Sequence, residues 1–463
     1  MDNEKINMDT MPLGWRHVRV FLVASLGQFL GAAQATLVGI IIPLFQIIRH
    51  PELSSFQQGV IACTGLMGRM LGSLFFGHLS DRFGYLLFFR LCPVLLFVAS
   101  GLAFWFDNLV AFTICLFFMG FSIGGEYALD PDYISEIMPD KWKLLMVGAS
   151  KATSAIGNIL MAMLCFFFLK DWQSAEVWNR LLLIMTAGAL IMILARIRFA
   201  QSPGWLIAHG NIPAAEKVVQ YFLGKNVVLG NLRNKPKKED LPKVGWSDLF
   251  QKGMVKKIVL GGVPWACEGV GVYGVGMFTP VLVLSLGLEA ASEGAFERIV
   301  NSLEITSYIN LFYLVGFGIG LFLVNRVYHI RIQTWGFLLC AAGLTLLLVA
   351  YKLHWATWLA LAGFMSFEVF LNAGPHLMTF ILPSQIYSVA ERGSGVGLSA
   401  AIGKLGAVIG VLFIPLLLKW GGATLVLAVT IGVNILGAFI TFVVGRAVFP
   451  PDKYKKGIIG SNS

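Results

Sequence analysis

Charged residues are scarce in this sequence, and the signatures of several large functional classes are missing. Only 13% of its residues are charged and 57% are hydrophobic, whereas soluble domains average about 25% charged residues. No glycine-rich nucleotide-binding loop is visible, which argues against direct use of ATP. No nucleophile with a companion base and no cluster of metal ligands is evident. We therefore expect neither an enzyme nor a cofactor or metal site.

Paired cysteines and a cleavable leader are also missing. The six cysteines all fall inside apolar runs, without the spacing of a zinc site or a disulfide framework. The first residues carry both acids and bases and lead into a run too long for a signal-peptide core, so we expect no cleaved signal. The net charge of +10 is no sign of nucleic acid binding, because the basic residues lie between apolar runs.

Long apolar runs dominate what is present. The mean hydropathy is +0.76, and the runs recur at about 20 residues, the length that crosses a bilayer as a helix. The sequence predicts an all-α membrane protein with spans near 19–47, 56–78, 86–105, 109–133, 144–169, 178–199, 257–285, 305–325, 333–351, 356–382, 393–418 and 422–445.

A polar segment divides these spans into six and six. We predict an N-terminal half at 1–199, a linker with an amphipathic helix at 200–256, a C-terminal half at 257–445 and a tail at 446–463. Most Lys and Arg residues fall in alternate segments, and the remaining loops hold Arg49, Lys170, Arg298, Lys352 and Lys419. The positive-inside rule then places both termini in the cytoplasm.

The stretch GHLSDRFG at 77–84 resembles the loop between the second and third helices of the major facilitator superfamily. GLFLVNRVYHIR at 320–331 is a degraded copy at the corresponding place in the second half. The resemblance implies twelve helices in two pseudo-symmetric six-helix halves around a central cavity. It also implies a conformational motif at Gly77, Asp81, Arg82 and Gly84.

Three further stretches are similar to the branch that contains sugar porters, phosphate and metabolite proton symporters and organic ion transporters. They are GFSIGGEYALDPDYISEIMP, QSPGWLIAHG and ERGSGVGLSAAIGKLGAVIG. The resemblance adds Glu136 and Arg392 to the conformational network. Gln201, Gly204 and Gln385 stand where the family has charged residues, so the cytoplasmic charge network is expected to be weaker here.

Six ionisable residues lie deep within the predicted spans, three bases and three acids: Arg69, Lys151, Lys404, Glu126, Glu268 and Glu368. A charge at the middle of a bilayer costs at least about 2.5 kcal/mol, so such residues are expected to face a wet cavity or one another. Asn372 and His376 follow Glu368 on one side of the tenth span. The role of Asp130 is left open, because Pro131 disrupts the local helix.

The resemblance gives two of the bases a role. Lys151 precedes Gly157 near the place where sugar porters bind sugar through a glutamine, and Lys404 matches an arginine that organic anion transporters use. An ammonium in place of an amide favours an anionic substrate. Candidate substrate contacts are Lys151, Lys404, Arg69, Gln34, Tyr273, Asn372 and His376; pairing of the bases within the protein is the alternative.

Gln34 cannot titrate, yet it stands where many proton-coupled relatives have an aspartate. Candidate proton carriers are therefore Glu126, Glu268, Asp130 and Glu368. We expect Glu126 to pair with Lys151 and to release it to the substrate when protonated.

The sequence thus predicts a secondary transporter of a small organic anion, coupled to protons. A transporter of neutral sugars or polyols and a non-transporting receptor on a transporter scaffold are the alternatives. We expect a monomer in a bacterial inner membrane, with the lipid bilayer, protons and a small molecule as its partners.

Overall fold

The computed structural model describes residues 6–48, 53–106, 108–230, 252–288, 294–387 and 392–451. Within these ranges the side chains of Asp81, Arg82, Asp132, Lys252, Ser384 and residues 392–394 are not described. The expected roles of Asp81, Arg82 and Arg392, the middle of the predicted linker at 231–251, and most of the predicted tail at 452–463 therefore lie outside the described part of the chain.

The first half is a bundle of long apolar helices. Its elements are α1 (Trp15–Ala24), α2 (Leu26–Ile48), α3 (Ser55–Phe83), α4 (Tyr85–Trp105), α5 (Leu109–Ile137), α6 (Asp140–Trp172), the 3₁₀-helix η1 (Ala175–Leu181) and α7 (Leu182–Arg196). The shorter helices α8 (Pro203–Ala208) and α9 (Ile212–Leu223) follow.

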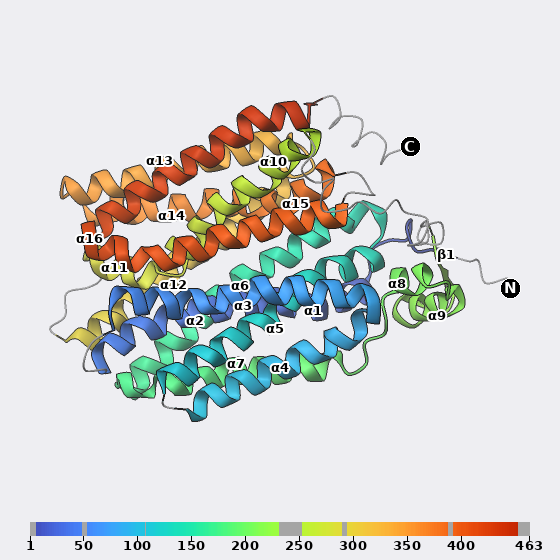
Figure 1. The fold of residues 1–463 in the computed structure, drawn as a ribbon, viewed down its shortest axis with the longest axis horizontal. Helices are drawn as coiled ribbons and strands as arrows, with labels where there is room; N and C mark the ends of the chain where they lie inside the picture. Colours follow the sequence, from blue (N-terminus) through green and yellow to red (C-terminus); the bar gives the residue numbers. More distant parts are fainter. Residues whose placement is uncertain are drawn as a thin grey trace.

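The second half repeats this architecture with more interruptions. Its elements are α10 (Lys252–Gly269), the π-helix η5 (Val270–Gly276), α11 (Thr279–Leu286), α12 (Ala295–Leu323), α13 (His329–Lys352), α14 (Thr357–Ala373), α15 (Pro375–Ile386) and α16 (Arg392–Val448). In Figure 1 the two halves lie beside each other, with α8 and α9 at one end of the bundle. We call this the α8–α9 end.

Ten helices among the described residues are long and apolar enough to cross a membrane. One of them, α16, supplies two spans, because its backbone leaves helical geometry at Gly421 and Gly422. The pair α14 and α15 supplies another span, interrupted at Gly374. The twelve predicted spans are therefore present. The eighth begins at Ala295, ten residues before its predicted start, because α12 continues beyond its apolar part.

The two halves pack their helices by the same rule. In the first half α2 packs on α6, α3 on α5 and α4 on α7. In the second half α10 packs on the first part of α16, α12 on α14 and α13 on the second part of α16. In each half the first span thus pairs with the fifth, the second with the fourth and the third with the sixth. This correspondence is the internal repeat that the degraded loop copy predicts.

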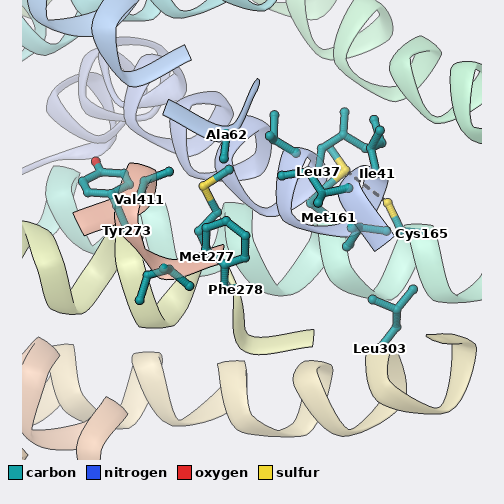
Figure 2. Packing of buried hydrophobic residues seen from close by; sticks show 14 of the residues in the cluster. Leu37, Ile41, Ala62, Met161, Cys165, Tyr273, Met277, Phe278, Leu303 and Val411 are labelled. Atoms are coloured by element: carbon teal, nitrogen blue, oxygen red, sulfur yellow. Dashed lines mark hydrogen bonds between the residues drawn. The ribbon is translucent and has the colours of Figure 1, made fainter. Parts of the chain in front are cut away.

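An apolar cluster joins the halves at the end opposite α8 and α9. It unites Leu37 and Ala62 of the first half with Met277 and Phe278 of the second, all nearly or fully buried (Figure 2). Gly39 in α2 packs so closely on the Met277 carbonyl that a Cβ atom there would overlap it. Close packing of this kind excludes water, so this end of the bundle is sealed in the structure.

The amino-terminal segment is tied to the α8–α9 end. Strand β1 (Ile6–Asn7) pairs in parallel with β2 (Val227–Val228), which follows α9. Met8 is fully buried in an apolar cluster that includes the inner face of α9. Asp9 accepts a hydrogen bond from the backbone of Asp140 at the start of α6. The predicted amphipathic helix therefore exists as α9, and it packs on protein through its apolar face.

Candidate functional site

Two lysines from opposite halves approach one aromatic ring. The Nζ atoms of Lys151 in α6 and Lys404 in α16 lie 4.7 and 4.5 Å from the centre of the Tyr127 ring in α5. Lys404 also lies 5.3 Å from the Tyr273 ring. Both lysines are at least nine-tenths buried. A ring face offers an ammonium group partial compensation for lost water, but no counter-charge.

These side chains border two adjoining pockets that share Tyr127, Lys151, Tyr273 and His376. The Lys404 pocket has a volume of about 290 Å³ and is completed by Trp265, Glu268, Thr379, Phe380 and Lys404. The Asn158 pocket has a volume of about 390 Å³ and is completed mainly by Thr36, Ser154, Asn158, Tyr313 and small or apolar residues of α2, η5 and the turn at Met277. Spans one, four, five, seven, eight, ten and eleven thus contribute to the described lining.

Two lining residues lie where a span departs from regular α-helix. Tyr273 is in the π-helix η5, between Gly271 and Gly274. His376 is in the first turn of α15, immediately after the break at Gly374 and Pro375. Irregular backbone within a membrane is tolerated where it lines a cavity, and π-helical turns are frequent at functional sites.

The second half contributes an acid to the Lys404 pocket. Glu268 of α10 is hydrogen-bonded to Nδ1 of His376. Both side chains are at least nine-tenths buried. The pocket wall therefore holds two ammonium groups against one carboxylate, and that carboxylate already has a partner.

Arg69 and Gln34 lie next to this wall, although neither lines the two pockets. Nη2 of Arg69 donates hydrogen bonds to Gln34 Oε1 at 2.8 Å and to the Gly31 carbonyl. The guanidinium carbon lies 5.8 Å from the centre of the Tyr273 ring. Nε and Nη1 of Arg69 are buried without a hydrogen-bond partner in the described part of the chain. Arg69 therefore adds positive charge beside the pockets.

Glu126 and Asp130 belong to a different cluster. Arg196, the last residue of α7, places Nη1 2.6 Å from Glu126 Oε2 and Nη2 3.5 Å from Asp130 Oδ1. The guanidinium also donates to the carbonyls of Phe89 and Val23. All three charged side chains are fully buried. We call Glu126, Asp130 and Arg196 the α5–α7 cluster.

The expected pairing of Glu126 with Lys151 is therefore wrong. Consecutive helical residues point about 100° apart, so Tyr127 faces Lys151 while Glu126 faces Arg196. Arg196 lies at the end of a span, where a base is expected to face the membrane surface. Its long side chain instead reaches back into the bundle.

Two further candidates lie away from the pockets. The Asn372 side chain donates to the Glu368 carbonyl at 2.8 Å within its own helix. Glu368 is fully buried close to Tyr313, and in the described ranges neither of its carboxylate oxygens has a hydrogen bond of ordinary geometry. Neither residue is part of the described lining, so the structure does not bring them into contact with the cavity.

Glu136 and Gln201 both form hydrogen bonds that involve the segment following α7, at the α8–α9 end. Glu136 accepts hydrogen bonds from the Ser202 hydroxyl and from the Gly204 backbone at 2.8 Å. Gln201 accepts from the Leu86 and Ser202 backbones at 3.0 and 3.1 Å.

A close approach in the conformational motif requires glycine at position 84. Gly84 has a φ of +89° and packs against Gln201, so a larger residue there would be strained. At Gly77, by contrast, a Cβ atom would make ordinary contact with Ala128 at 3.6 Å. In the second half, His329 Nδ1 lies 2.7 Å from Gln385 Oε1, within hydrogen-bond distance.

Residues missed by sequence reasoning include Tyr127, Asn158 and Arg196. Tyr127 is flanked by two lysines in space but by none in sequence, and Asn158 follows Lys151 by two helical turns on the same face. The seven-residue spacing between Lys151 and Asn158 could have identified Asn158 from the sequence. In the described ranges no three His, Cys, Asp or Glu side chains form a possible metal site. All six cysteines are buried and free.

The sequence is similar to those of known transport proteins. Residues 21–445 match the family model described as sugar (and other) transporter. The chain is 26% identical over 446 residues to the inner membrane metabolite transport protein YgcS of Escherichia coli, covering 96% of this chain and 94% of YgcS. It is 25% identical over 448 residues to a repressible high-affinity phosphate permease of Neurospora crassa, covering 87% of this chain and 78% of the permease.

Solved structures share the fold. The xylose transporter XylE of E. coli in a partially occluded inward open conformation superimposes with a TM-score of 0.75 at 18% identity, covering 93% of this chain and 98% of XylE. XylE bound to 6-bromo-6-deoxy-D-glucose gives 0.73 at 19% identity, covering 94% and 96% of the two chains.

Proposed function

Because the chain belongs to the sugar (and other) transporter family of the major facilitator superfamily, and is thus an integral membrane transporter and not an enzyme, we propose that it carries a small organic anion by alternating access. The observation that carries this proposal is the approach of Lys151 and Lys404 to one ring beside shared pockets. Buried ammonium groups without a counter-charge are costly in a membrane. An anionic substrate supplies that charge.

The balance of charge favours an anion over a neutral sugar. Lys151, Lys404 and the adjacent Arg69 are opposed in the described wall by Glu268, which is already bonded to His376. A neutral substrate would leave this excess positive charge in place. A carboxylate or phosphate group would compensate it through charge-assisted hydrogen bonds, the strongest kind available to a lysine.

We further propose that transport is coupled to protons and that the α5–α7 cluster holds the transported proton. Two carboxylates share one guanidinium there, and in the described part of the chain Glu126 Oε1 and Asp130 Oδ2 have no hydrogen bond of ordinary geometry. A proton on either acid would remove the repulsion between them. Glu268 is the second candidate, because it lines the Lys404 pocket itself.

The α5–α7 cluster and the pockets contact the same helix. Gly27 of α2 packs on Glu126 and Asp130, whereas Gly31, one turn later, packs on Tyr127. A shift of α2 along α5 would therefore change the packing both at the α5–α7 cluster and at Tyr127. Through this shared contact with α2, protonation of the α5–α7 cluster would affect the position of Tyr127 and the lysines beside it, although no ion pair joins the described side chains of Glu126 and Lys151.

We propose a bacterial inner membrane as the location, by analogy with YgcS, with the α8–α9 end in the cytoplasm. The excess of Lys and Arg in the segments at this end supports the orientation. The apolar cluster around Met277 would then lie on the outer side of the membrane.

Uptake into proteoliposomes tests the transport proposal. Purified protein is reconstituted and challenged with labelled carboxylates, phosphate and neutral sugars, with and without an inward proton gradient. We expect anions to be taken up and to compete with one another, and neutral sugars to do neither. Uptake of a neutral sugar that no anion inhibits would overturn the anion assignment.

A further inference from the structure

We infer that the substrate is a hydroxylated anion, with an acidic group at one end and hydroxyl groups along the rest of its carbon chain. This inference rests on the proposed function, since it assumes that the lysines bind an anion. It is carried by the chemical difference between the two adjoining pockets. One pocket is built for charge, and the other is built for neutral hydrogen-bonding groups.

The Lys404 pocket is the place for the acidic group. Both ammonium groups border it, together with the aromatic walls of Tyr127, Tyr273 and Trp265. An anion there lies between the two halves, since Lys151 comes from the first half and Lys404 from the second. The bond to Glu268 holds one nitrogen of His376, so its other ring nitrogen remains for the ligand.

The Asn158 pocket has a different wall. Thr36, Ser154, Asn158 and Tyr313 supply hydroxyl and amide groups, and the only side chain with a permanent charge in its described lining is Lys151. A second acidic group in this pocket would find no second cation. An alkyl chain would leave the Asn158 Nδ2 group without an acceptor in the described lining. Hydroxyl groups, which both donate and accept, match this wall.

The orientation of the Asn158 amide also suits a ligand with hydroxyl groups. The Thr36 hydroxyl donates a hydrogen bond to Asn158 Oδ1 at 2.9 Å, which fixes the Nδ2 group on the other side of the amide. No hydrogen bond joins Nδ2 to an acceptor in the described residues. The Ser154 hydroxyl donates to the Lys151 carbonyl at 2.6 Å and keeps its oxygen free to accept. The pocket thus offers both a donor and an acceptor.

The two pockets share Tyr127, Lys151, Tyr273 and His376, so one short chain can reach from the ammonium groups of the Lys404 pocket to the polar wall of the Asn158 pocket. Six-carbon acids are therefore suitable probes of both pockets at once.

Matched ligands of equal chain length test the inference. Binding to the purified full chain is measured by calorimetry for three aldonates (gluconate, galactonate and mannonate), hexanoate, glucitol 6-phosphate, hexyl phosphate and glucitol. Each hydroxylated acid thus has an alkyl partner with the same head group. The neutral polyol controls for the hydroxyl groups alone.

We expect at least one hydroxylated acid to bind roughly tenfold or more tightly than its alkyl partner and than glucitol, because one unpaired buried donor costs about this much. The head group of the pair that binds more tightly shows whether the Lys404 pocket prefers a carboxylate or a phosphate. Equal binding within both pairs would overturn the inference while leaving the anion proposal intact. Binding of glucitol without binding of any acid would overturn the anion proposal itself.

Two variants test whether the Asn158 pocket is responsible for the preference for hydroxylated over alkyl acids. Asn158→Leu and Thr36→Val should reduce the preference for the hydroxylated acid to nearly one, with affinity for the alkyl acid retained. Retained binding of the alkyl acid also shows that the variants fold. Lys404→Gln is the matched control, because it should weaken the binding of both ligands of a pair by the same factor. An unchanged preference in both pocket variants would contradict the assignment.

Discussion

Lys151 and Lys404 belong to opposite halves of the bundle, yet their ammonium nitrogens lie 4.7 and 4.5 Å from the centre of the same ring, that of Tyr127. The two like charges are therefore held within reach of one small ligand. An anion placed there would attract both halves toward itself. Binding would then favour closure of the bundle around the substrate, which is what alternating access requires.

The first prediction concerns Lys151. Lys151→Ala should reduce anion affinity and uptake by about 10- to 100-fold, because a hydrogen bond to a charged group contributes about 1.5–3 kcal/mol. Lys151→Arg should restore uptake only in part, since a planar guanidinium does not replace a compact ammonium. The measurement is uptake by proteoliposomes at equal protein content. Lys170→Ala is the control, because Lys170 is exposed near the other end of α6. Unchanged uptake by Lys151→Ala would exclude it from the site.

A second prediction separates coupling from binding. Glu126→Gln keeps the shape of the acid but cannot bind or release a proton. It should retain substrate exchange across the membrane and lose accumulation driven by an inward proton gradient. Counterflow and gradient-driven uptake are measured in the same proteoliposomes, with Glu304→Gln at an exposed position as the control. If the variant still accumulates substrate, the proton is carried elsewhere, with Glu268 as the next candidate.

The third prediction concerns the α5–α7 cluster as a structural unit. Arg196→Met should lower the free energy of unfolding by about 3–5 kcal/mol, because it leaves buried carboxylates without their counter-charge. Adding Glu126→Leu to Arg196→Met should recover part of this loss. Denaturant unfolding of both single variants and the double variant gives the coupling energy. Strictly additive losses would show that Arg196 and Glu126 do not stabilise each other.

The fourth prediction concerns the contact of α2 with this cluster. A Cβ atom at Gly27 would lie 2.5 Å from Asp130 Oδ2 and 2.8 Å from Glu126 Oε2. Gly27→Ala should therefore destabilise the protein by about 1–3 kcal/mol through overpacking. Gly432→Ala, at a helical position with open space around it, should instead stabilise by about 0.5–1 kcal/mol. Thermal unfolding of the two variants compares them directly, and equal effects would show that α2 is not held tightly against α5.

Much of the fold was readable from the sequence because lipid imposes it. Runs of apolar residues must form helices to satisfy their backbone, so the twelve spans and their pairing into two halves followed from hydropathy and the repeated loop. The irregular turns around Tyr273 and Gly374 did not follow, since glycine and proline mark a possible break without saying where a cavity lies.

The candidate site was predictable only in part. Depth along a helix identified Lys151, Lys404, Glu268 and His376, which line the pockets. Depth alone does not determine which side of a helix a residue faces. Glu126 and Tyr127 are neighbours in sequence but face different clusters, and the long side chain of Arg196 moved its charge away from the position that its Cα suggested.

The short amino-terminal strand has a practical consequence for producing the protein. The chain carries internal methionines at Met8 and Met11. Translation that began at Met11 would omit β1 and Asp9, which bonds to the start of α6 and lies 3.8 Å from Lys143. A preparation containing both products would be a mixture in which only the longer chain has the contacts of Asp9 with the first turn of α6. Intact-mass analysis before any transport assay would separate such heterogeneity from the effect of a mutation.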